Sequence, residues 1–155
     1  MKNILFAGLV SMIFFGNSAC LKDKGCQNKT VQSETAAINA YAAANGINGT
    51  THSSGVVYEV TVPGSGIKPN PFSKVTIRYV GKLLDGTVFD SQTTNNVTFN
   101  LGESIAGFQI ALQQVQKGGT IRFIIPSSMG YGCSGQGNIP SNSILYFEVQ
   151  LIDVQ

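Results

Sequence analysis

Residues 80–91 read VGKLLDGTVFDS, a strand that runs into an Asp-Gly turn and a second strand that returns. Asp-Gly between two apolar runs favours a tight hairpin, because glycine accepts the positive φ angles that a two-residue turn requires. Two strands joined so tightly must be antiparallel. The returning strand places a carboxylate, Asp90, directly after the ring of Phe89. The stretch therefore predicts an antiparallel sheet and raises the question of what this acid does.

Strand patterns continue on both sides of the hairpin, interrupted by one helix pattern. Residues 104–119 carry apolar side chains at spacings of three and four, which predicts an amphipathic helix. The stretch 127–142 is a long loop of the kind that is functional or mobile in compact domains. We therefore expect an α+β domain in which five or six antiparallel strands cover one short helix. The predicted strands are 56–62, 74–83, 88–91, 97–101, 120–126 and 143–154.

Residues 1–19 have the composition of an export signal, because Lys2 precedes an apolar run that is too short for a stable transmembrane helix. Small residues stand directly before Cys20, as in the lipobox of bacterial lipoproteins, although Asn17 replaces the leucine that this pattern prefers. The pattern predicts a lipoprotein held at the membrane by acylated Cys20, in a periplasmic or cell-surface location. A conventional secretory peptide, with Cys20 an ordinary residue of the mature chain, is the alternative. Residues 20–32 are polar and aperiodic, which suits a tether.

Two further cysteines, Cys26 and Cys133, remain if Cys20 is acylated. An even pair in an oxidising compartment is compatible with a disulfide. The pair is equally compatible with two independent thiols, because their wide separation in the sequence says nothing about their distance in the fold.

A short helix precedes the strands. Residues 33–44 begin with a serine that fits an N-cap and end before Asn45-Gly46, which is a helix stop. A linker follows to residue 54, and we interpret its histidine, His52, as a solvated residue. The helix face expected to pack on the domain comprises Ala37, Ile38, Tyr41 and Ala44.

The composition excludes several classes of function. The formal net charge is +2, from 10 basic and 8 acidic residues that are interspersed, so we expect no nucleic-acid partner. With one histidine and no nucleophile-elbow serine, hydrolytic triads lack parts. The cysteines and the histidine form no recognisable metal-binding set, so we expect neither a metal nor a cofactor. What remains in excess is aromatic side chains.

Five blocks of the sequence resemble the FKBP-type peptidyl-prolyl isomerases in their order and spacing. The resemblance implies a half-barrel sheet wrapped on one short helix, which agrees with the pattern above. The blocks are IRYVGKLLDGTVFDS (77–91), VTFNLG (97–102), IAGFQIAL (105–112), IPSSMGYG (125–132) and NIPSNSILYFEVQL (138–151). The chain then divides into a signal (1–19), a tether (20–32), a helix with its linker (33–54) and an isomerase domain (55–155).

The resemblance implies a pocket for a prolyl ring, with Asp90 as its one acid and Tyr131 as the hydroxyl that holds a substrate carbonyl. These two are the implied catalytic residues. Phe108 stands where a tryptophan is common in the family, Ser104 where valine is usual and Val97 where some members have an aromatic residue. These departures bear on macrolide binding more than on activity. The implied substrate-binding residues are Tyr79, Phe89, Ile105, Phe108, Ile139 and Phe147, and for each aromatic one core packing is the alternative.

Such a pocket needs no nucleophile, because the barrier of about 18–20 kcal/mol is rotation about the amide bond. The twisted transition state has a less polar carbonyl, so a dry aromatic cavity tolerates it better than the planar amide. The resemblance implies isomerisation of Xaa-Pro bonds in unfolded or partly folded exported proteins, with macrolides as inhibitors. An FKBP-like module that binds Pro-containing segments without catalysis is the alternative. The N-terminal helix is shorter than the dimerisation helix of some exported relatives, so we expect a monomer.

Asp90 lacks the arginine that often follows this aspartate in relatives, since the next residues read SQTTNN (91–96). A half-buried carboxylate needs a hydrogen-bond donor. We therefore expect the Tyr131 hydroxyl or backbone N–H groups to support Asp90. On this hypothesis Asp90 positions Tyr131 and the substrate and transfers no proton.

Overall fold

The structure is a computed structural model that describes residues 25–155. The export signal (1–19) and the acylated Cys20 lie outside the described residues and stay predictions. No helix within the described range is long and apolar enough to cross a membrane.

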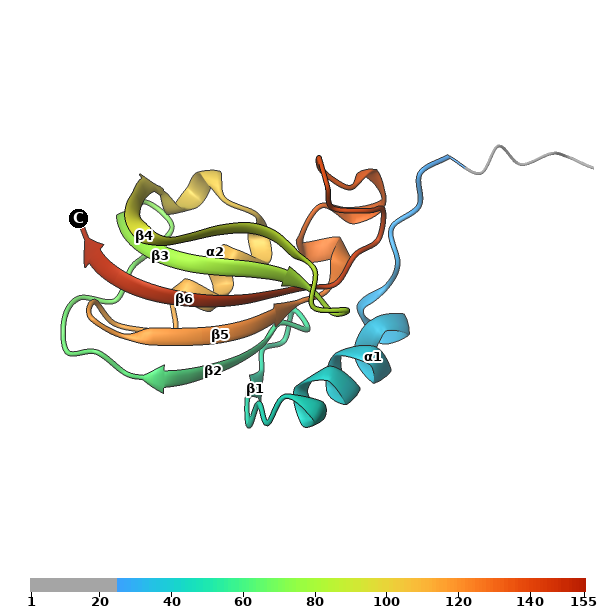
Figure 1. Ribbon diagram of the computed structural model, residues 1–155, viewed down its shortest axis with the longest axis horizontal. Helices are drawn as coiled ribbons and strands as arrows, with labels where there is room; N and C mark the ends of the chain where they lie inside the picture. The colour runs from blue at the N-terminus through green and yellow to red at the C-terminus, as the bar shows by residue number, and fades with distance from the viewer. Residues whose placement is uncertain (1–24) are drawn as a thin grey trace, which may run out of the picture.

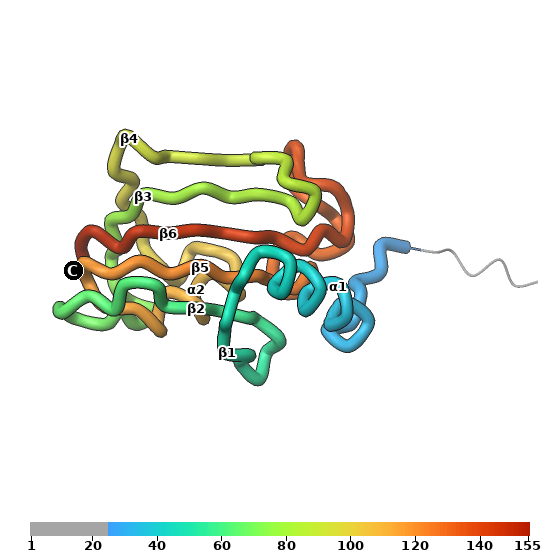
Figure 2. Tube along the Cα trace, turned by 60° about the horizontal axis from the view of Figure 1, so that its bottom comes forward, coloured from blue at the N-terminus to red at the C-terminus, as the bar shows by residue number. Residues whose placement is uncertain are grey.

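One antiparallel sheet of six strands forms the body of the protein, in the order β1-β2-β5-β6-β3-β4 (Figures 1 and 2). This confirms the predicted α+β architecture. Every pairing is antiparallel. A turn or loop joins β1 to β2, β3 to β4 and β5 to β6, and the pairs β2–β5 and β3–β6 complete the sheet. The strands are β1 (Thr50–Thr51), β2 (Val57–Val62), β3 (Lys74–Leu83), β4 (Val88–Asn100), β5 (Thr120–Ile125) and β6 (Leu145–Val154).

The edge strand β4 is continuous, whereas the sequence predicted two strands separated by a polar interruption. Ile77 of β3 pairs with Val97, and Tyr79 pairs with Gln92. Between these pairs β4 advances five residues and β3 two, so β4 accommodates three extra residues in a bulge. The Arg78 guanidinium donates to the Asn96 side chain at 2.9 Å across this irregularity. An edge strand tolerates such a bulge because its backbone forms hydrogen bonds with a neighbouring strand on one side only.

The helix that the sheet covers, α2 (Ala106–Leu112), has 7 residues and is shorter than the predicted segment 104–119. After Leu112 the backbone tightens, since the N–H of Gln114 bonds to the carbonyl of Ala111 at 3.0 Å, three residues back. The apolar spacing continues nevertheless, because Val115 is fully buried. Apolar periodicity therefore located the buried stripe but overestimated the helix.

The main core lies between α2 and the sheet. Gly107 allows the close approach, because a Cβ there would collide with the side chain of Ile125. The core is built from fully or nearly fully buried side chains of α2, the strands and the loops: Val56, Val75, Ile77, Leu101, Phe108, Ala111, Leu112, Val115, Ile121, Phe123, Ile125, Ile139, Leu145, Phe147, Val149, Leu151 and Val154.

The N-terminal helix α1 (Val31–Ala44) packs on the opposite face of the sheet and forms a second core. Its N-cap is Thr30, whose hydroxyl accepts the N–H of Ser33 at 3.3 Å, so the helix begins before the predicted serine cap. The predicted face was only partly right, because Ala37 and Ala44 are exposed. The second core consists of Ile38, Ala42, Ile47, Val57, Ile124 and Tyr146, with Tyr41, Leu84 and Ile144 packed at its edge.

Two residues of the segment predicted as a linker, Thr50 and Thr51, form β1 and pair with β2. The loop between β5 and β6, residues 127–142, contains two short turns of 3₁₀ helix, η2 (Ser127–Met129) and η3 (Gly132–Ser134). We call it the pocket loop. Figure 1 shows this orange-red loop and the blue N-terminal segment at the end of the molecule opposite the C-terminus.

Candidate active site

A pocket of about 330 Å³ opens on the face of the sheet that α2 covers. Its walls come from β3, β4, β6, α2, the turn before α2 and the pocket loop. Residues that lie far apart in the sequence therefore meet in one cavity. The lining residues are Ile77, Tyr79, Phe89, Asp90, Val97, Phe99, Glu103, Ser104, Ile105, Phe108, Tyr131 and Phe147.

Phe108 is the centre of the aromatic packing beneath the pocket. Its ring meets the rings of Phe123 and Phe147 edge to face, with centroids 5.3 and 5.2 Å apart. Phe89 meets Phe147 in the same way at 5.4 Å. Edge-to-face contacts fix ring orientations, because the positive ring edge is attracted to the negative ring face. The floor and one wall are therefore a preorganised apolar surface.

Gly81 makes room for two of these rings. A Cβ at this position would lie 2.7 Å from the Phe89 ring and 2.8 Å from the Phe147 ring, closer than side chains tolerate. The absent side chain lets both rings fold over β3. The glycine at this point of the strand is therefore a requirement of the pocket.

Phe89 and Asp90 both line the pocket although they are neighbours on one strand. Successive residues of a regular strand point to opposite faces. Here Gly81 pairs with Asp90 and Lys82 with Val88, which leaves Phe89 as an extra residue in a bulge. A bulge redirects side chains and bends the strand, and it explains how a ring and an acid at consecutive positions serve one cavity.

The hydrogen-bond donor to the Asp90 carboxylate is the Tyr79 hydroxyl, whereas the sequence led us to expect the Tyr131 hydroxyl or backbone N–H groups. The Tyr79 hydroxyl donates to Asp90 Oδ2 at 2.5 Å. The two residues lie on the paired strands β3 and β4 with Gly81 beside them, so the register of the hairpin brings them together. Burial, and then this hydrogen bond, raise the pKa of Tyr79 above its ordinary value of 10.0. The phenol therefore stays protonated and donates throughout the neutral range.

The match to known proteins agrees with this geometry. Residues 65–152 match the model of the FKBP-type peptidyl-prolyl cis-trans isomerases, which is more than half of the chain. The chain belongs to this family. It is 39% identical over 107 residues to the FKBP-type peptidyl-prolyl cis-trans isomerase FkpA of Escherichia coli, covering 68% of this chain and 40% of that protein. A probable FkpA of Neisseria meningitidis is 40% identical over 116 residues, covering 73% and 42%.

Solved structures of the family share the fold. The crystal structure of FkpA from Escherichia coli superposes with a TM-score of 0.70 at 34% identity, covering 81% of this chain and 62% of that one. A peptidyl-prolyl cis-trans isomerase from Pseudomonas syringae superposes with a TM-score of 0.69 at 32% identity, covering 83% and 98%. The chain spans about 40% of the length of the curated relatives named above.

Most residues that the family resemblance implied meet in the pocket. Tyr79, Phe89, Asp90, Ile105, Phe108, Tyr131 and Phe147 all line it. Ile139 does not. Its side chain is 7% exposed and belongs to the main core, because the chain turns back there through paired backbone hydrogen bonds between Gln136 and Ile139.

The structure also adds lining residues that the implied family site left out. Ile77 lies two positions before Tyr79 on the same strand face, so strand alternation alone could have found it. Phe99 tilts against Phe108 with centroids 6.1 Å apart and serves core and pocket together. Glu103 is a second carboxylate at the pocket, where one acid was expected, and it accepts a hydrogen bond from the Asn100 amide at 2.9 Å. No sequence signal indicated Glu103.

The side chains that line the pocket determine which chemistry this site can perform. No cluster of three or more metal-ligating side chains occurs among residues 25–155. His52 lies at the other face of the sheet, half-buried, with its ring nitrogen Nδ1 2.9 Å from the Ser54 hydroxyl. The pocket itself offers rings, hydroxyls and two carboxylates. These groups can bind and orient an apolar ring and its carbonyls.

Proposed function

We propose that this chain is a peptidyl-prolyl cis/trans isomerase that binds a prolyl ring in the aromatic pocket. The observation that carries the proposal is the set of rings of Phe89, Phe108 and Phe147, fixed edge to face around one cavity of about 330 Å³. Membership of the FKBP-type family supports it.

Catalysis would arise from the difference between a planar and a twisted amide. The planar form keeps a polar, conjugated carbonyl that water solvates well, and the twisted form has lost that conjugation. A cavity walled by rings withdraws water from both and therefore disfavours the planar form more. The Tyr131 hydroxyl would donate to a substrate carbonyl and hold the rotated geometry. Asp90 would act through Tyr79, whose position and protonation it maintains.

Ile105 and Tyr79 would complete the walls against the ring, and Ile139 would support them from the core. The proposed monomer rests on the short N-terminal helix α1, which has 14 residues. Macrolides that mimic a prolyl segment would compete for the cavity.

The proposed substrates are Pro-containing segments of unfolded or partly folded exported proteins. A disulfide joins Cys26 and Cys133 in the structure, and disulfides persist in oxidising compartments. This supports an exported location and fits the export signal of residues 1–19. The lipid anchor on Cys20 would then hold the domain at a membrane a few residues before the disulfide.

The test is the refolding of a protein whose slow phase is limited by proline isomerisation, with the full chain added in catalytic amount. We expect acceleration, reduced by Tyr131→Phe and by Phe147→Leu. Tyr41→Phe, on the opposite face of the sheet, is the matched control and should keep the full rate. Binding of a proline peptide with no acceleration would instead identify a non-catalytic binding module and would sink the proposal.

A further inference from the structure

The residues before the sheet are attached to the pocket loop at several points. We call residues 26–34 the N-terminal strap. The sequence predicted most of this segment as a free tether. In the structure its side chains and backbone contact the loop that carries Tyr131, which is a loop of the kind that moves unless something restrains it.

The first attachment lies four residues before Tyr131. Glu34 is 2% exposed, and its Oε2 accepts the backbone N–H of Ser127 at 2.8 Å. Ser127 is fully buried and opens the turn η2, so this bond fixes the point where the loop leaves β5.

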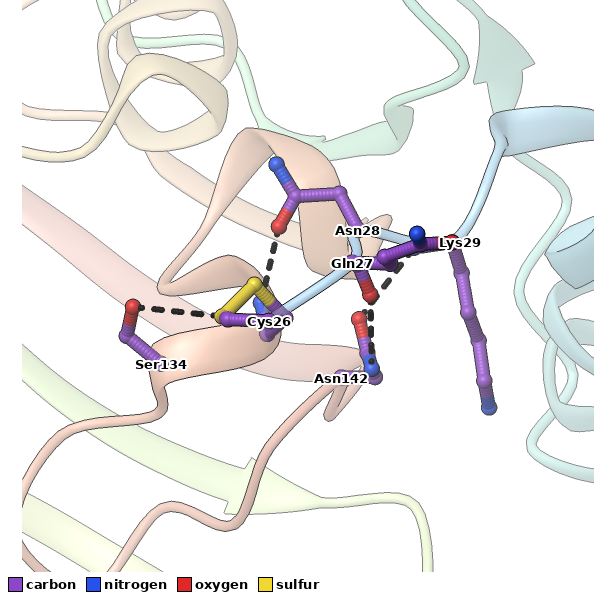
Figure 3. The surroundings of a disulfide bond; sticks show 7 residues. Cys26, Gln27, Asn28, Lys29, Ser134 and Asn142 are labelled. Carbon is purple, nitrogen blue, oxygen red and sulfur yellow. Dashed lines mark hydrogen bonds between the residues drawn. A yellow bond between two sulfur atoms is a disulfide. The ribbon is translucent and has the colours of Figure 1, made fainter. Parts of the chain in front are cut away.

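The second attachment lies two residues after Tyr131. The disulfide joins Cys26 to Cys133 with their Cα atoms 5.4 Å apart. Beside it, Asn28 Oδ1 accepts the backbone N–H of Cys133 at 2.8 Å (Figure 3). A covalent bond and a hydrogen bond thus hold the same residue of the loop.

The third attachment closes the base of the loop. Asn142 Oδ1 accepts the backbone N–H of Lys29 at 3.2 Å, and its amide donates to the carbonyl of Gln27 at 3.3 Å (Figure 3). The N–H of Asn142 bonds back to the carbonyl of Gly132 at 2.7 Å. Asn142 has a φ of +55°, a left-handed conformation that asparagine tolerates better than most residues.

A buried glutamate at position 34 stabilises the fold less well than an apolar side chain would, so stability alone does not explain it. Its second oxygen, Oε1, and the Ser127 hydroxyl are both buried with no hydrogen-bond partner among residues 25–155. Burying polar groups without partners opposes folding, and an apolar side chain would avoid that cost. What the carboxylate provides is a directed acceptor at one backbone N–H of the loop.

We propose that the N-terminal strap is a positioning element of the prolyl pocket, with Glu34 and the Cys26–Cys133 disulfide holding the pocket loop on both sides of Tyr131. This inference rests on the proposed isomerase function. The aromatic floor comes from the sheet and α2 and does not depend on the strap, so ground-state binding of the prolyl ring persists without it. Only the orientation of the Tyr131 hydroxyl in the rotated state is lost, so the strap acts on kcat more than on KM.

The test measures kcat and KM of the oxidised full chain on a proline peptide by exchange NMR, for wild type, Glu34→Ala and Glu34→Gln. A misplaced orienting group slows the reaction, so for Glu34→Ala we expect kcat to fall about three- to tenfold with KM within about twofold. Glu34→Gln should retain the wild-type kcat, because its amide oxygen still accepts the Ser127 N–H. Ile38→Val, a buried change in the same helix away from the loop, should leave kcat unchanged.

A second perturbation keeps the proposal testable if Glu34→Ala does not fold. The variant Cys26→Ala/Cys133→Ala, or the wild type treated with a dithiol that converts the disulfide to two thiols, should lower kcat in the same way. Hydrogen exchange gives a readout independent of activity, and the backbone amides of residues 127–133 should exchange faster in both cases.

The outcomes separate the two proposals. A wild-type chain without isomerase activity overturns the proposed function. In that case the hydrogen exchange of the amides of residues 127–133 still tests whether the strap holds the loop. An active wild type whose kcat and loop exchange are unchanged in Glu34→Ala and after reduction overturns the strap. A loss of kcat that Glu34→Gln shares with Glu34→Ala also overturns the role of Glu34, since that result requires the charge and not the acceptor.

Discussion

Neighbouring residues on β5 and β6 supply two different cores. Phe123 pairs with Phe147 and faces α2, and the next pair, Ile124 with Tyr146, faces α1. The alternation of each strand therefore sends two consecutive large side chains to the two faces of one sheet. Each face is covered by a single helix, yet only one of them holds the proposed prolyl pocket.

The two faces differ in chemistry more than in empty space. The cavity beside α1 has a volume of about 270 Å³, close to that of the aromatic pocket, but His52, Thr35 and Asn39 are among its walls and neither Phe nor Tyr lines it. A cavity with hydrogen-bonding walls would stabilise the planar amide much as water does, so it would not favour the twisted form. The comparison teaches that aromatic walls, and not the size of a hollow, distinguish the candidate site.

The largest effect is expected when one ring of the aromatic wall is removed. Phe147→Ala removes a ring that is 5% exposed and should lower the free energy of unfolding by about 3–5 kcal/mol and abolish activity. Urea denaturation and the refolding assay measure the two quantities. Tyr146→Ala, its neighbour on the other face, should destabilise without removing the activity of the folded fraction. Equal losses of activity in the two variants would mean that the faces are not functionally distinct.

A smaller change disturbs the rings without removing them. Gly81→Ala places a methyl group against Phe89 and Phe147 and should cost about 1–3 kcal/mol of stability through forced ring shifts. We expect kcat/KM to fall at least several-fold, since the walls move. Gly25→Ala, where a Cβ meets no atom within 4 Å, is the control. Full activity in Gly81→Ala would show that the pocket tolerates displaced rings.

The hydroxyl of Tyr79 offers a milder test of the same wall. Tyr79→Phe keeps the ring and removes the donor to Asp90, so stability should change by about 0.5–1.5 kcal/mol, the usual net value of one hydrogen bond. A several-fold loss of kcat is expected if Asp90 acts through Tyr79. Tyr41→Phe on the α1 face should have no kinetic effect. Loss of activity in Asp90→Asn with none in Tyr79→Phe would point to a direct role for Asp90.

A further effect appears only at alkaline pH, outside the working range of the protein, and involves a tyrosine on each face. Burial, followed by the charge of Glu148, raises the pKa of Tyr146 from 10.0 to about 12. The unfolded chain then loses this proton near pH 10 while the folded chain keeps it, so stability present below pH 10 declines as the pH rises towards 12. Tyr146→Phe should flatten that decline in urea midpoints recorded across this range, and Tyr79→Phe should act in the same direction. Parallel curves for wild type and both variants would contradict this.

Local sequence patterns predicted the architecture of the sheet well, but they predicted the limits of β4 and of α2 poorly. The Asp-Gly hairpin and the alternating strands predicted the antiparallel architecture, because residues close in the sequence determine turn and face. The same reasoning divided β4 in two, since a polar stretch resembles an interruption when its bulge against β3 is unknown. It also extended α2 to residue 119, because apolar spacing does not distinguish an α-helix from a tighter turn after Leu112.

The residues of the candidate site were largely predicted, but the contacts among them were not. Resemblance to the family indicated the rings of the pocket, but Asp90 was assigned the wrong hydroxyl, Ile139 was placed at the wall and not in the core, and Glu103 was overlooked. Each of these depends on register or on a turn. A shift of one residue in a strand sends a side chain to the other face, and no local pattern records such a shift.

The sequence by itself determined the apolar face of most strands, the position of the hairpin turn and an excess of aromatic side chains. The family resemblance implied that Phe89 and Asp90 share a pocket, but only the tertiary structure decided the bulge that turns both towards it. Only the tertiary structure decided that Tyr79 holds Asp90, and that Glu34 and Cys26 reach the loop of Tyr131. The physical reason is the separation along the sequence of the residues involved. Side-chain periodicity is set within a few residues, whereas these contacts join segments whose meeting depends on the pairing and packing of the whole chain.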